Sequence, residues 1–211
     1  MSITVETMTG TAIEPFLPDL ARLRITVFRE WPYLYDGDVA YEEKYLQLYV
    51  KSAGAAVILA RDGEKVIGAS TCLPMADEMD AIREPFEKRG LPVSDFFYFG
   101  ESVLQKEYRG HGLGVRFFQE REKHALETSS SDFATFCSVR RPEVHPSKPE
   151  GATTLHAFWA KRGYHPLPGV TCSIDWKEPG DEGETPHLLD FFIKSLRGRP
   201  VPAVLLNGET V

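Results

Sequence analysis

Residues 108–118 read YRGHGLGVRFF and place Gly110, Gly112 and Gly114 directly before a run of residues with helical spacing. Glycine inside a helix costs about 1 kcal/mol relative to alanine, so these glycines are expected at the first turn of the helix. A strand-to-helix turn leaves backbone N–H groups unpaired at the positive end of the helix dipole. Because glycine lacks Cβ and tolerates positive φ, an anion can approach these groups. The stretch therefore predicts a phosphate-binding turn, to which Arg109 adds a fixed positive charge.

Two common phosphate loops do not fit this turn. The glycine spacing is G-x-G-x-G, whereas a dinucleotide-binding turn needs G-x-G-x-x-G. No Lys-Ser or Lys-Thr pair follows the glycines, which excludes a P-loop. A glycine-rich turn without a ligand remains the structural alternative.

The elements around the turn predict a mixed sheet with helices on both faces. Asp62-Gly63 separates two β-branched runs and indicates a hairpin. Alternation and apolar runs predict strands at 2–7, 55–61, 65–73, 95–105, 132–140 and 169–177. Helical spacing predicts helices at 15–29, 40–52, 77–89, 113–127, 153–164 and 187–196. A hairpin followed by alternating strands and helices is typical of an α/β (α+β) fold with a mixed sheet.

Composition limits the partners. The chain has 211 residues and a net charge of −7, which argues against nucleic acid as the main partner. The sequence lacks an apolar run long enough to cross a membrane and a signal-peptide pattern, so we expect a cytoplasmic protein without membrane partners. The three cysteines lie far apart without CxxC spacing, so no metal site is expected. A homodimer is compatible with the sequence, which does not decide the oligomeric state.

The segment SVLQKEYRGHGLGVRFF, residues 102–118, resembles the acyl-CoA-binding segment of the GNAT (GCN5-related N-acetyltransferase) family. Arg109, Gly112 and Gly114 occupy the defined positions of its signature, Gln/Arg-x-x-Gly-x-Gly/Ala. FWAKRGY, residues 158–164, resembles the end of that family's helix before the last strands. The resemblance implies a GNAT-like domain over residues 1–177, with a mostly antiparallel sheet and a splayed parallel strand pair. Residues 178–211 are expected to add a loop, a short helix and a tail to the same domain.

The same resemblance implies how acetyl-CoA would bind. Strands 97–106 and 132–140 would diverge and admit the pantetheine arm, which the backbone of Ser102 and Leu104 would bind. The Leu104 N–H would also donate to the thioester oxygen, a contact that strengthens as the carbonyl carbon becomes tetrahedral. The amides of residues 110–115 would hold the diphosphate. The expected coenzyme-binding residues are Ser102, Val103, Leu104, Arg109, Gly110, His111, Gly112, Leu113, Gly114 and Val115.

Glu101 is the candidate general base, because it lies three residues before Leu104 on the same predicted strand, close to where the family often places its base. A carboxylate there can take the proton that an ammonium acceptor must lose. The alternative is a carboxylate that only binds a nearby loop. Trp159 stands where the family has a tyrosine that protonates the leaving thiolate, and an indole N–H is no useful acid. Tyr164 is expected to be a core aromatic. The source of the thiolate proton therefore stays open.

The acceptor is expected to bind between the first two helices, by analogy with the family. Trp31, Tyr33 and Tyr35 would enclose a cation and Asp36 would pair with it. Alternatively, these aromatic residues fill the core and Asp36-Gly37 only makes a turn. Arg140 and His145 would approach the acceptor from the loop after strand 132–140, as an anion contact and a second base. The alternative is that Arg140 and His145 are solvated residues of a loop without a function.

Two functions follow from these observations. In the first, the protein transfers acetyl from acetyl-CoA to a primary amine of a small molecule by direct attack in a ternary complex. In the second, suggested by Trp159, it is a catalytically silent acyl-CoA-binding regulatory module.

Overall fold

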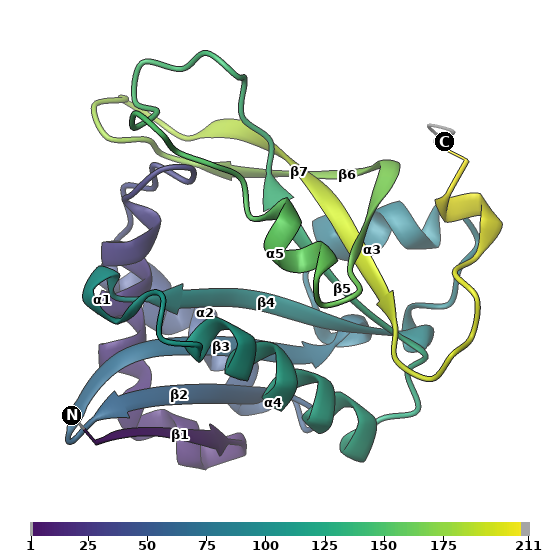
Figure 1. The fold of residues 1–211 in the computed structure, drawn as a ribbon, viewed down its shortest axis with the longest axis horizontal. Coiled ribbons are helices and arrows are strands. Elements are labelled where there is room, and N and C mark those ends of the chain that lie inside the picture. The colour runs from purple at the N-terminus through teal and green to yellow at the C-terminus, as the bar shows by residue number, and fades with distance from the viewer. Residues whose placement is uncertain (1, 208–211) are drawn as a thin grey trace.

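The computed structural model describes residues 2–207, and within them one seven-stranded sheet runs through the molecule (Figure 1). The strand order is β1-β2-β3-β4-β5-β7-β6. The strands are β1 Ile3–Met8, β2 Ala56–Asp62, β3 Lys65–Pro74, β4 Phe96–Leu104, β5 Phe133–Val139, β6 His165–Trp176 and β7 Thr185–Ser195. The α-helices are α1 Leu17–Phe28, α2 Val39–Lys51, α3 Asp80–Glu87, α4 Leu113–Thr128 and α5 His156–Ala160. The mixed α/β class expected from the sequence is confirmed.

β4 and β5 form the parallel pair of the sheet, and they separate along their length. They pair only from Phe96 opposite Phe133 to Tyr98 opposite Thr135. Beyond Tyr98, β4 continues beside β3, whereas β5 continues beside β7. Figure 1 shows the two halves of the sheet diverging from this point. The splayed strand pair predicted at 97–106 and 132–140 is therefore confirmed.

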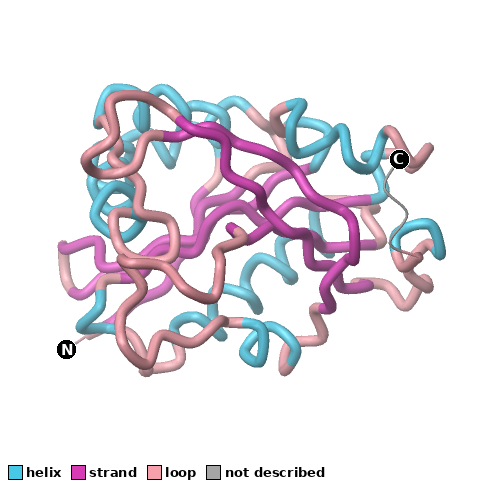
Figure 2. The backbone as a smooth tube through the Cα atoms, turned by 90° about the horizontal axis from the view of Figure 1, so that it is seen from above, coloured by secondary structure: helices cyan, strands magenta, loops and turns pink. Residues whose placement is uncertain are grey.

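The two faces of the sheet carry separate hydrophobic clusters, and helices cover both (Figure 2). Successive side chains of β4 alternate between the faces, as strand geometry requires. Phe96 and Tyr98 join the cluster under α1, α2 and α3, whereas Phe97 and Phe99 join the cluster under α4. The long apolar runs of the central strands thus reflect burial on both faces.

A β-bulge interrupts the pairing of β3 with β4 next to the point where β5 diverges. Ser70 pairs with Ser102 and Cys72 with Phe99, so Thr71 faces both Gly100 and Glu101. A Cβ on Gly100 would lie 2.4 Å from Thr71 Oγ1 and 2.5 Å from Tyr49 Oη. Glycine is therefore required at this position, and the bulge directs Glu101 to the α1–α2 side.

The helix predicted at 187–196 is wrong, because this segment forms β7. β7 lies between β5 and β6 and pairs with both, and its leucine, isoleucine and phenylalanine residues other than Leu188 are buried. Leu189 and Phe191 enter one cluster and Phe192 enters the other, while Leu188 is 47% exposed. A short apolar run of this kind cannot be assigned by periodicity alone. Residues 208–211 of the predicted tail lie outside the described residues.

None of the helices in the described part of the chain combines the length and apolar character that a membrane crossing requires.

Candidate active site

The glycine-rich turn leads from β4 into α4 and leaves the first amides of the helix without helical acceptors. Gly110 and Gly112 both have φ of +82°, and Gly112 is the N-cap of α4. The hydrogen bonds of the helix begin at the Gly112 carbonyl, which accepts from Val115 and Arg116 at 3.0 and 3.1 Å. No side chain caps the helix in the described structure, and its first turn contains no acidic residue. The amides ahead of Val115 are therefore available to an anion.

Space around the turn differs between the glycines. A Cβ on Gly110 or Gly112 would meet no atom within 4 Å, so their positive φ, not crowding, calls for glycine. A Cβ on Gly114 would lie 3.2 Å from Phe158 Cζ, so this glycine admits the Phe158 ring. Leu113 packs into the core and Val115 is half-buried. The open side of the turn is therefore at residues 110–112.

Arg109 connects the turn to the end of β4 and to the loop that follows α1. Its Nε donates to the Leu104 carbonyl at 3.1 Å, and its Nη1 contacts Glu30 Oε2 at 2.9 Å. His111 is exposed, and its Nδ1 lies 2.9 Å from the Arg109 carbonyl oxygen. The Arg109 guanidinium thus fixes the geometry of the turn, in addition to the positive charge expected from the sequence.

The backbone of β4 presents hydrogen-bonding groups to the gap between β4 and β5. Gln105 N–H donates to the Ile67 carbonyl at 2.9 Å, so backbone groups at Gln105 and Val103 point toward β3. Because these groups alternate along an antiparallel strand, those of Ser102 and Leu104 point to the opposite side, where β5 has diverged. The Val103 side chain is buried, whereas Ser102 is exposed and its Oγ lies 2.8 Å from Ser70 Oγ. The Leu104 N–H therefore faces the gap.

Glu101 lies at the bulge in a buried ionic cluster. Its Oε1 lies 2.6 Å from Arg24 Nη1, and its Oε2 is 3.5 Å from the Tyr49 hydroxyl. Thr71 Oγ1 accepts from the Glu101 N–H at 3.1 Å, and Ser70 Oγ donates to its carbonyl at 3.0 Å. The bulge thus leaves no ladder partner for Glu101, and side chains of β3 satisfy its backbone.

Arg24 of α1 joins Glu101 to a second buried carboxylate, Glu42 of α2. Its Nε donates to Glu42 Oε2, while its Cζ lies 4.6 Å from the centroid of the Tyr45 ring and 5.1 Å from that of Phe28. Burial lowers the pKa of Arg24, but Glu101 and Glu42 raise it, and the net shift is well upward. Arg24 is therefore a permanent cation held between two carboxylates.

Two tyrosine hydroxyls and one more carboxyl group adjoin this cluster. Burial first, and the neighbouring carboxylates second, raise the pKa values of Tyr45 and Tyr49 well above 10. Their hydroxyl groups lie 3.3 Å apart. Burial also raises the pKa of Glu78 to about 7. The hydroxyl groups therefore stay protonated at neutral pH and can donate hydrogen bonds.

The predicted acceptor loop lies beside the end of β6. Asp36 contacts Arg29 Nη1 at 2.8 Å and Lys177 Nζ at 3.6 Å, so its charge is already balanced. The Tyr33 ring packs against Phe28 with centroids 4.6 Å apart. Burial raises the pKa values of both Tyr33 and Tyr35, with a hydrogen bond to Glu42 adding to the shift of Tyr35. Tyr33 and Tyr35 are thus half-buried between the loop and the Arg24 cluster.

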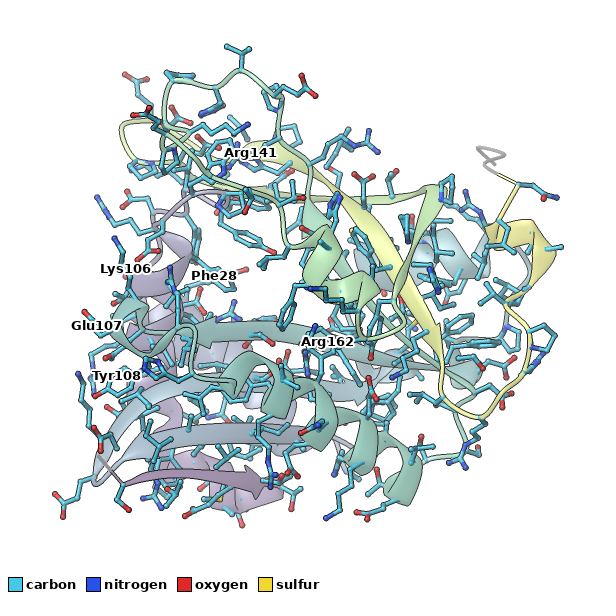
Figure 3. All side chains as sticks on the ribbon, viewed as in Figure 1. Phe28, Lys106, Glu107, Tyr108, Arg141 and Arg162 are labelled. Carbon is cyan, nitrogen blue, oxygen red and sulfur yellow. The ribbon has the colours of Figure 1, made fainter. Side chains whose placement is uncertain are left out.

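The loop after β5 contacts the loop between α1 and α2, and its two arginines have structural partners. Arg140 forms a two-point ion pair with Asp190 of β7. Arg141 donates to the Pro32 and Tyr33 carbonyls, each at 2.6 Å, and lies above the gap between the sheet halves (Figure 3). The ring of His145 lies 5.0 Å from that of Trp31 between centroids. The structure therefore brings Trp31 and His145 together and joins Arg141 to the Tyr33 carbonyl, while Arg140 pairs with Asp190.

The aromatic residues of α5 lie on the α4 side of the sheet. Trp159 packs against Phe136 and Phe192, with ring centroids 5.0 and 4.7 Å away. Tyr164 is 1% exposed and donates to Glu122 Oε1 at 3.1 Å, so the expectation of a core aromatic is confirmed. Burial raises its pKa well above 10.

Sequence reasoning missed Arg24, Glu42 and Tyr49, which surround Glu101. The sequence of the first two helices contained an indication that Arg24 and Glu42 are buried. Arg24 lies four residues after Leu20, and Glu42 three residues before Tyr45, so both charges occupy the apolar stripe. Residues 2–207 contain no His, Cys, Asp and Glu grouping suited to a metal ion.

No protein-family model and no curated protein matches the chain. Its fold does match solved structures. A ribosomal-protein-alanine N-acetyltransferase from Brucella melitensis is 14% identical, with 91% of this chain and 99% of that chain covered and a TM-score of 0.58. A GNAT-family acetyltransferase from Staphylococcus aureus is 11% identical, with 93% and 100% covered and a TM-score of 0.54.

The PaiA N-acetyltransferase from Thermoplasma acidophilum, solved in complex with coenzyme A, is 13% identical, with 92% of this chain and 99% of that chain covered and a TM-score of 0.51. At these identities the likeness concerns the fold. The chain therefore has the GNAT fold over nearly its whole length.

Proposed function

We propose that the protein is an N-acetyltransferase that transfers acetyl from acetyl-CoA to a primary amine of a small molecule. One observation carries the proposal: the open amides of the Gly110–Gly112 turn lie at the end of β4, whose free backbone edge borders the gap to β5. A diphosphate at the turn and an extended pantetheine arm along β4 fit these two features together. The GNAT fold of the chain supports the same function.

The chain's own groups have distinct roles in this proposal. Acetyl-CoA supplies an activated thioester, from which the acceptor nitrogen displaces the thiol. Glu101 accepts the proton that the ammonium group loses, directly or through one water. Its Oε2 is the proton-accepting atom, because Oε1 is bound to Arg24. The Leu104 N–H donates to the thioester oxygen as negative charge develops there.

The leaving thiolate takes its proton from solvent in this mechanism. Tyr164, the nearest family-like alternative, donates its hydroxyl to Glu122 on the α4 side and is buried. The indole N–H of Trp159 is too weak an acid to protonate the thiolate. The acceptor would enter from the α1–α2 loop, where Tyr33 and Tyr35 lie beside the Arg24 cluster. Two buried carboxylates at that cluster, Glu42 and Glu101, against one arginine leave a negative charge in excess, which favours a cationic amine.

The test is the release of CoA thiol from acetyl-CoA over a panel of small amines. Glu101→Gln is expected to lower kcat by about 10²- to 10⁴-fold, with acetyl-CoA affinity nearly unchanged. Glu127→Gln, at an exposed carboxylate of α4, is the matched control and should leave both unchanged. Tight CoA binding without turnover on any amine would instead support the silent acyl-CoA-binding module. Absence of CoA binding would exclude both functions.

A further inference from the structure

The acceptor loop, residues 29–38 between α1 and α2, is attached to the end of the hairpin that β6 and β7 form. The Trp176 indole N–H donates to the Tyr33 carbonyl at 3.1 Å, and the Asp36 N–H donates to the Lys177 carbonyl at 2.8 Å. Figure 1 shows the acceptor loop, this hairpin end and the loop after β5 meeting at the upper left of the molecule. The hairpin end therefore helps to fix where the acceptor loop lies.

Arg141 joins these three segments. Its Nε and Nη2 donate to the Pro32 and Tyr33 carbonyls, each at 2.6 Å, and its Nη1 contacts Glu178 Oε1 at 2.5 Å. The side chains of this ion pair are 10% exposed for Arg141 and 19% exposed for Glu178. Because the donors of a guanidinium have a fixed planar arrangement, the carboxylate that holds one of them also sets the direction of the others. Glu178 thus orients Arg141 toward the acceptor loop.

His187 of β7 lies against the same carboxylate oxygen. Its ring stacks on the Trp176 ring with centroids 3.7 Å apart, and its side chain is 9% exposed. Its Nε2 lies 3.3 Å from the Trp176 carbonyl oxygen and 3.2 Å from Thr185 Oγ1, whereas its Nδ1 lies 3.6 Å from Glu178 Oε1. A neutral imidazole carries one N–H and an imidazolium carries two. Protonation of the ring therefore places a second cation beside the oxygen that Arg141 uses.

The surroundings of His187 oppose this second cation. The charged groups that act on the ring, among the described residues, are Arg141, Glu178 and Asp175. Burial lowers the pKa of His187 from 6.5 and Arg141 lowers it further, whereas the Trp176 carbonyl and the two carboxylates raise it, and the net shift is downward. His187 is therefore neutral at pH 7, and Glu178 is left to Arg141.

We propose that His187 is a positioning residue for the acceptor loop: its neutral ring leaves Glu178 Oε1 to Arg141, and its protonated ring competes for that oxygen and releases the loop. The inference rests on the proposed function, because it takes the acceptor loop as a wall of the amine site. A ring exposed in a released loop has its ordinary affinity for protons, so acid shifts the equilibrium toward release as pH falls below 6.5. The acceptor should then bind more weakly, while coenzyme A at the glycine-rich turn should bind as before.

The first test measures amide hydrogen exchange of residues 33–36 in the full-length protein without ligands, at pH 7.5 and pH 5.5. Protection factors, which remove the intrinsic pH dependence of exchange, are expected to fall severalfold at pH 5.5. His187→Gln keeps a neutral donor near the Trp176 carbonyl and should hold its protection at both pH values. Glu178→Gln removes the carboxylate charge that orients Arg141, and should show low protection at both. His165→Gln, at an exposed histidine of β6, is the matched control and should behave as the unmodified protein.

The second test uses the CoA-release assay with the best amine of the panel between pH 5.5 and pH 8. The KM for the amine is expected to rise as pH falls below 6.5 in the unmodified protein and in His165→Gln, and to rise less in His187→Gln. The pH profile of kcat, which reports Glu101, should be the same in all three proteins, as should the dissociation constant of coenzyme A. A role of His187 in stability alone would not change the KM profile in this selective way.

The outcomes separate this inference from the proposed function. Equal protection of residues 33–36 at both pH values in the unmodified protein would overturn the inference and leave the acetyltransferase proposal intact. A pH-dependent protection that persists in His187→Gln would also overturn it, as would release of the loop with an unchanged KM. Loss of protection in acid that depends on His187, in a protein without turnover on any amine, would contradict the proposed function and support control of the loop by His187.

Discussion

Removal of the buried cation Arg24 tests the reasoning about the Glu101 cluster most directly. In Arg24→Met, an apolar side chain of similar length replaces the guanidinium that holds Glu42 and Glu101. The side chains involved are 12%, 1% and 6% exposed, in the order Arg24, Glu42 and Glu101. Solvent therefore screens these pairs little, and both carboxylates lose their counter-charge at once.

The expected loss of stability is about 3–5 kcal/mol, the cost of leaving a buried charge unpaired. This is a large part of the 5–15 kcal/mol typical of a folded domain. The cost arises from the stranded carboxylates rather than from the missing arginine. Neutralising them in the triple variant Arg24→Met/Glu42→Gln/Glu101→Gln should therefore restore most of the lost stability.

The assay is urea unfolding followed by circular dichroism at pH 7. Arg22→Met is the control on the same helix, because Arg22 pairs with Asp19 on the surface with 61% of its side chain exposed. This control should lose less than about 1 kcal/mol. A loss below about 1 kcal/mol in Arg24→Met, or a triple variant no more stable than the single one, would refute the argument.

Three further predictions concern other parts of the site. Because burial raises the pKa of Glu78 from 4.5 to about 7, the folded protein holds a proton that the unfolded chain releases, and stability should fall as pH rises through this interval. Unfolding titrations should find Glu78→Gln more stable than the unmodified protein by up to about 3 kcal/mol at pH 8, with the difference gone near pH 4; a constant difference would contradict this. Gly112→Ala, at φ +82°, should cost about 1–2 kcal/mol and weaken CoA binding in calorimetry, whereas Gly183→Ala, a loop control without positive φ, should change neither. Arg141→Lys should loosen the acceptor loop, seen as faster hydrogen exchange at residues 33–35, because lysine cannot serve the Pro32 carbonyl, the Tyr33 carbonyl and Glu178 together; unchanged exchange would argue against that clamp.

The local part of the site was predictable from the sequence, since β4, the glycine turn and α4 are contiguous. Glycine spacing, the preceding apolar strand and the following helical pattern all refer to residues within a few positions of each other. Leu104, Arg109 and Gly112 consequently occupy the elements expected for them. The prediction that β4 and β5 diverge came from the family resemblance, because no local sequence pattern encodes where two strands separate.

The tertiary part of the site was not predictable in the same way. Glu101 was identified from its position on β4, but its partners Arg24 and Glu42 come from two helices far away in the sequence. Their placement on apolar stripes indicated burial without indicating which group they would meet. β7 was missed for a related reason: burial on both faces removes the alternation that distinguishes a strand from a short helix.

The position of β7 has a consequence for the synthesis of the chain. This strand separates β5 from β6, so β6 cannot join the sheet until residues 185–195 have left the ribosome. The first four strands in the sheet order, with α1, α2 and α4, have no such requirement. We therefore expect the first four strands to become compact during translation, whereas β6 joins the sheet only after residues 185–195 have been synthesised.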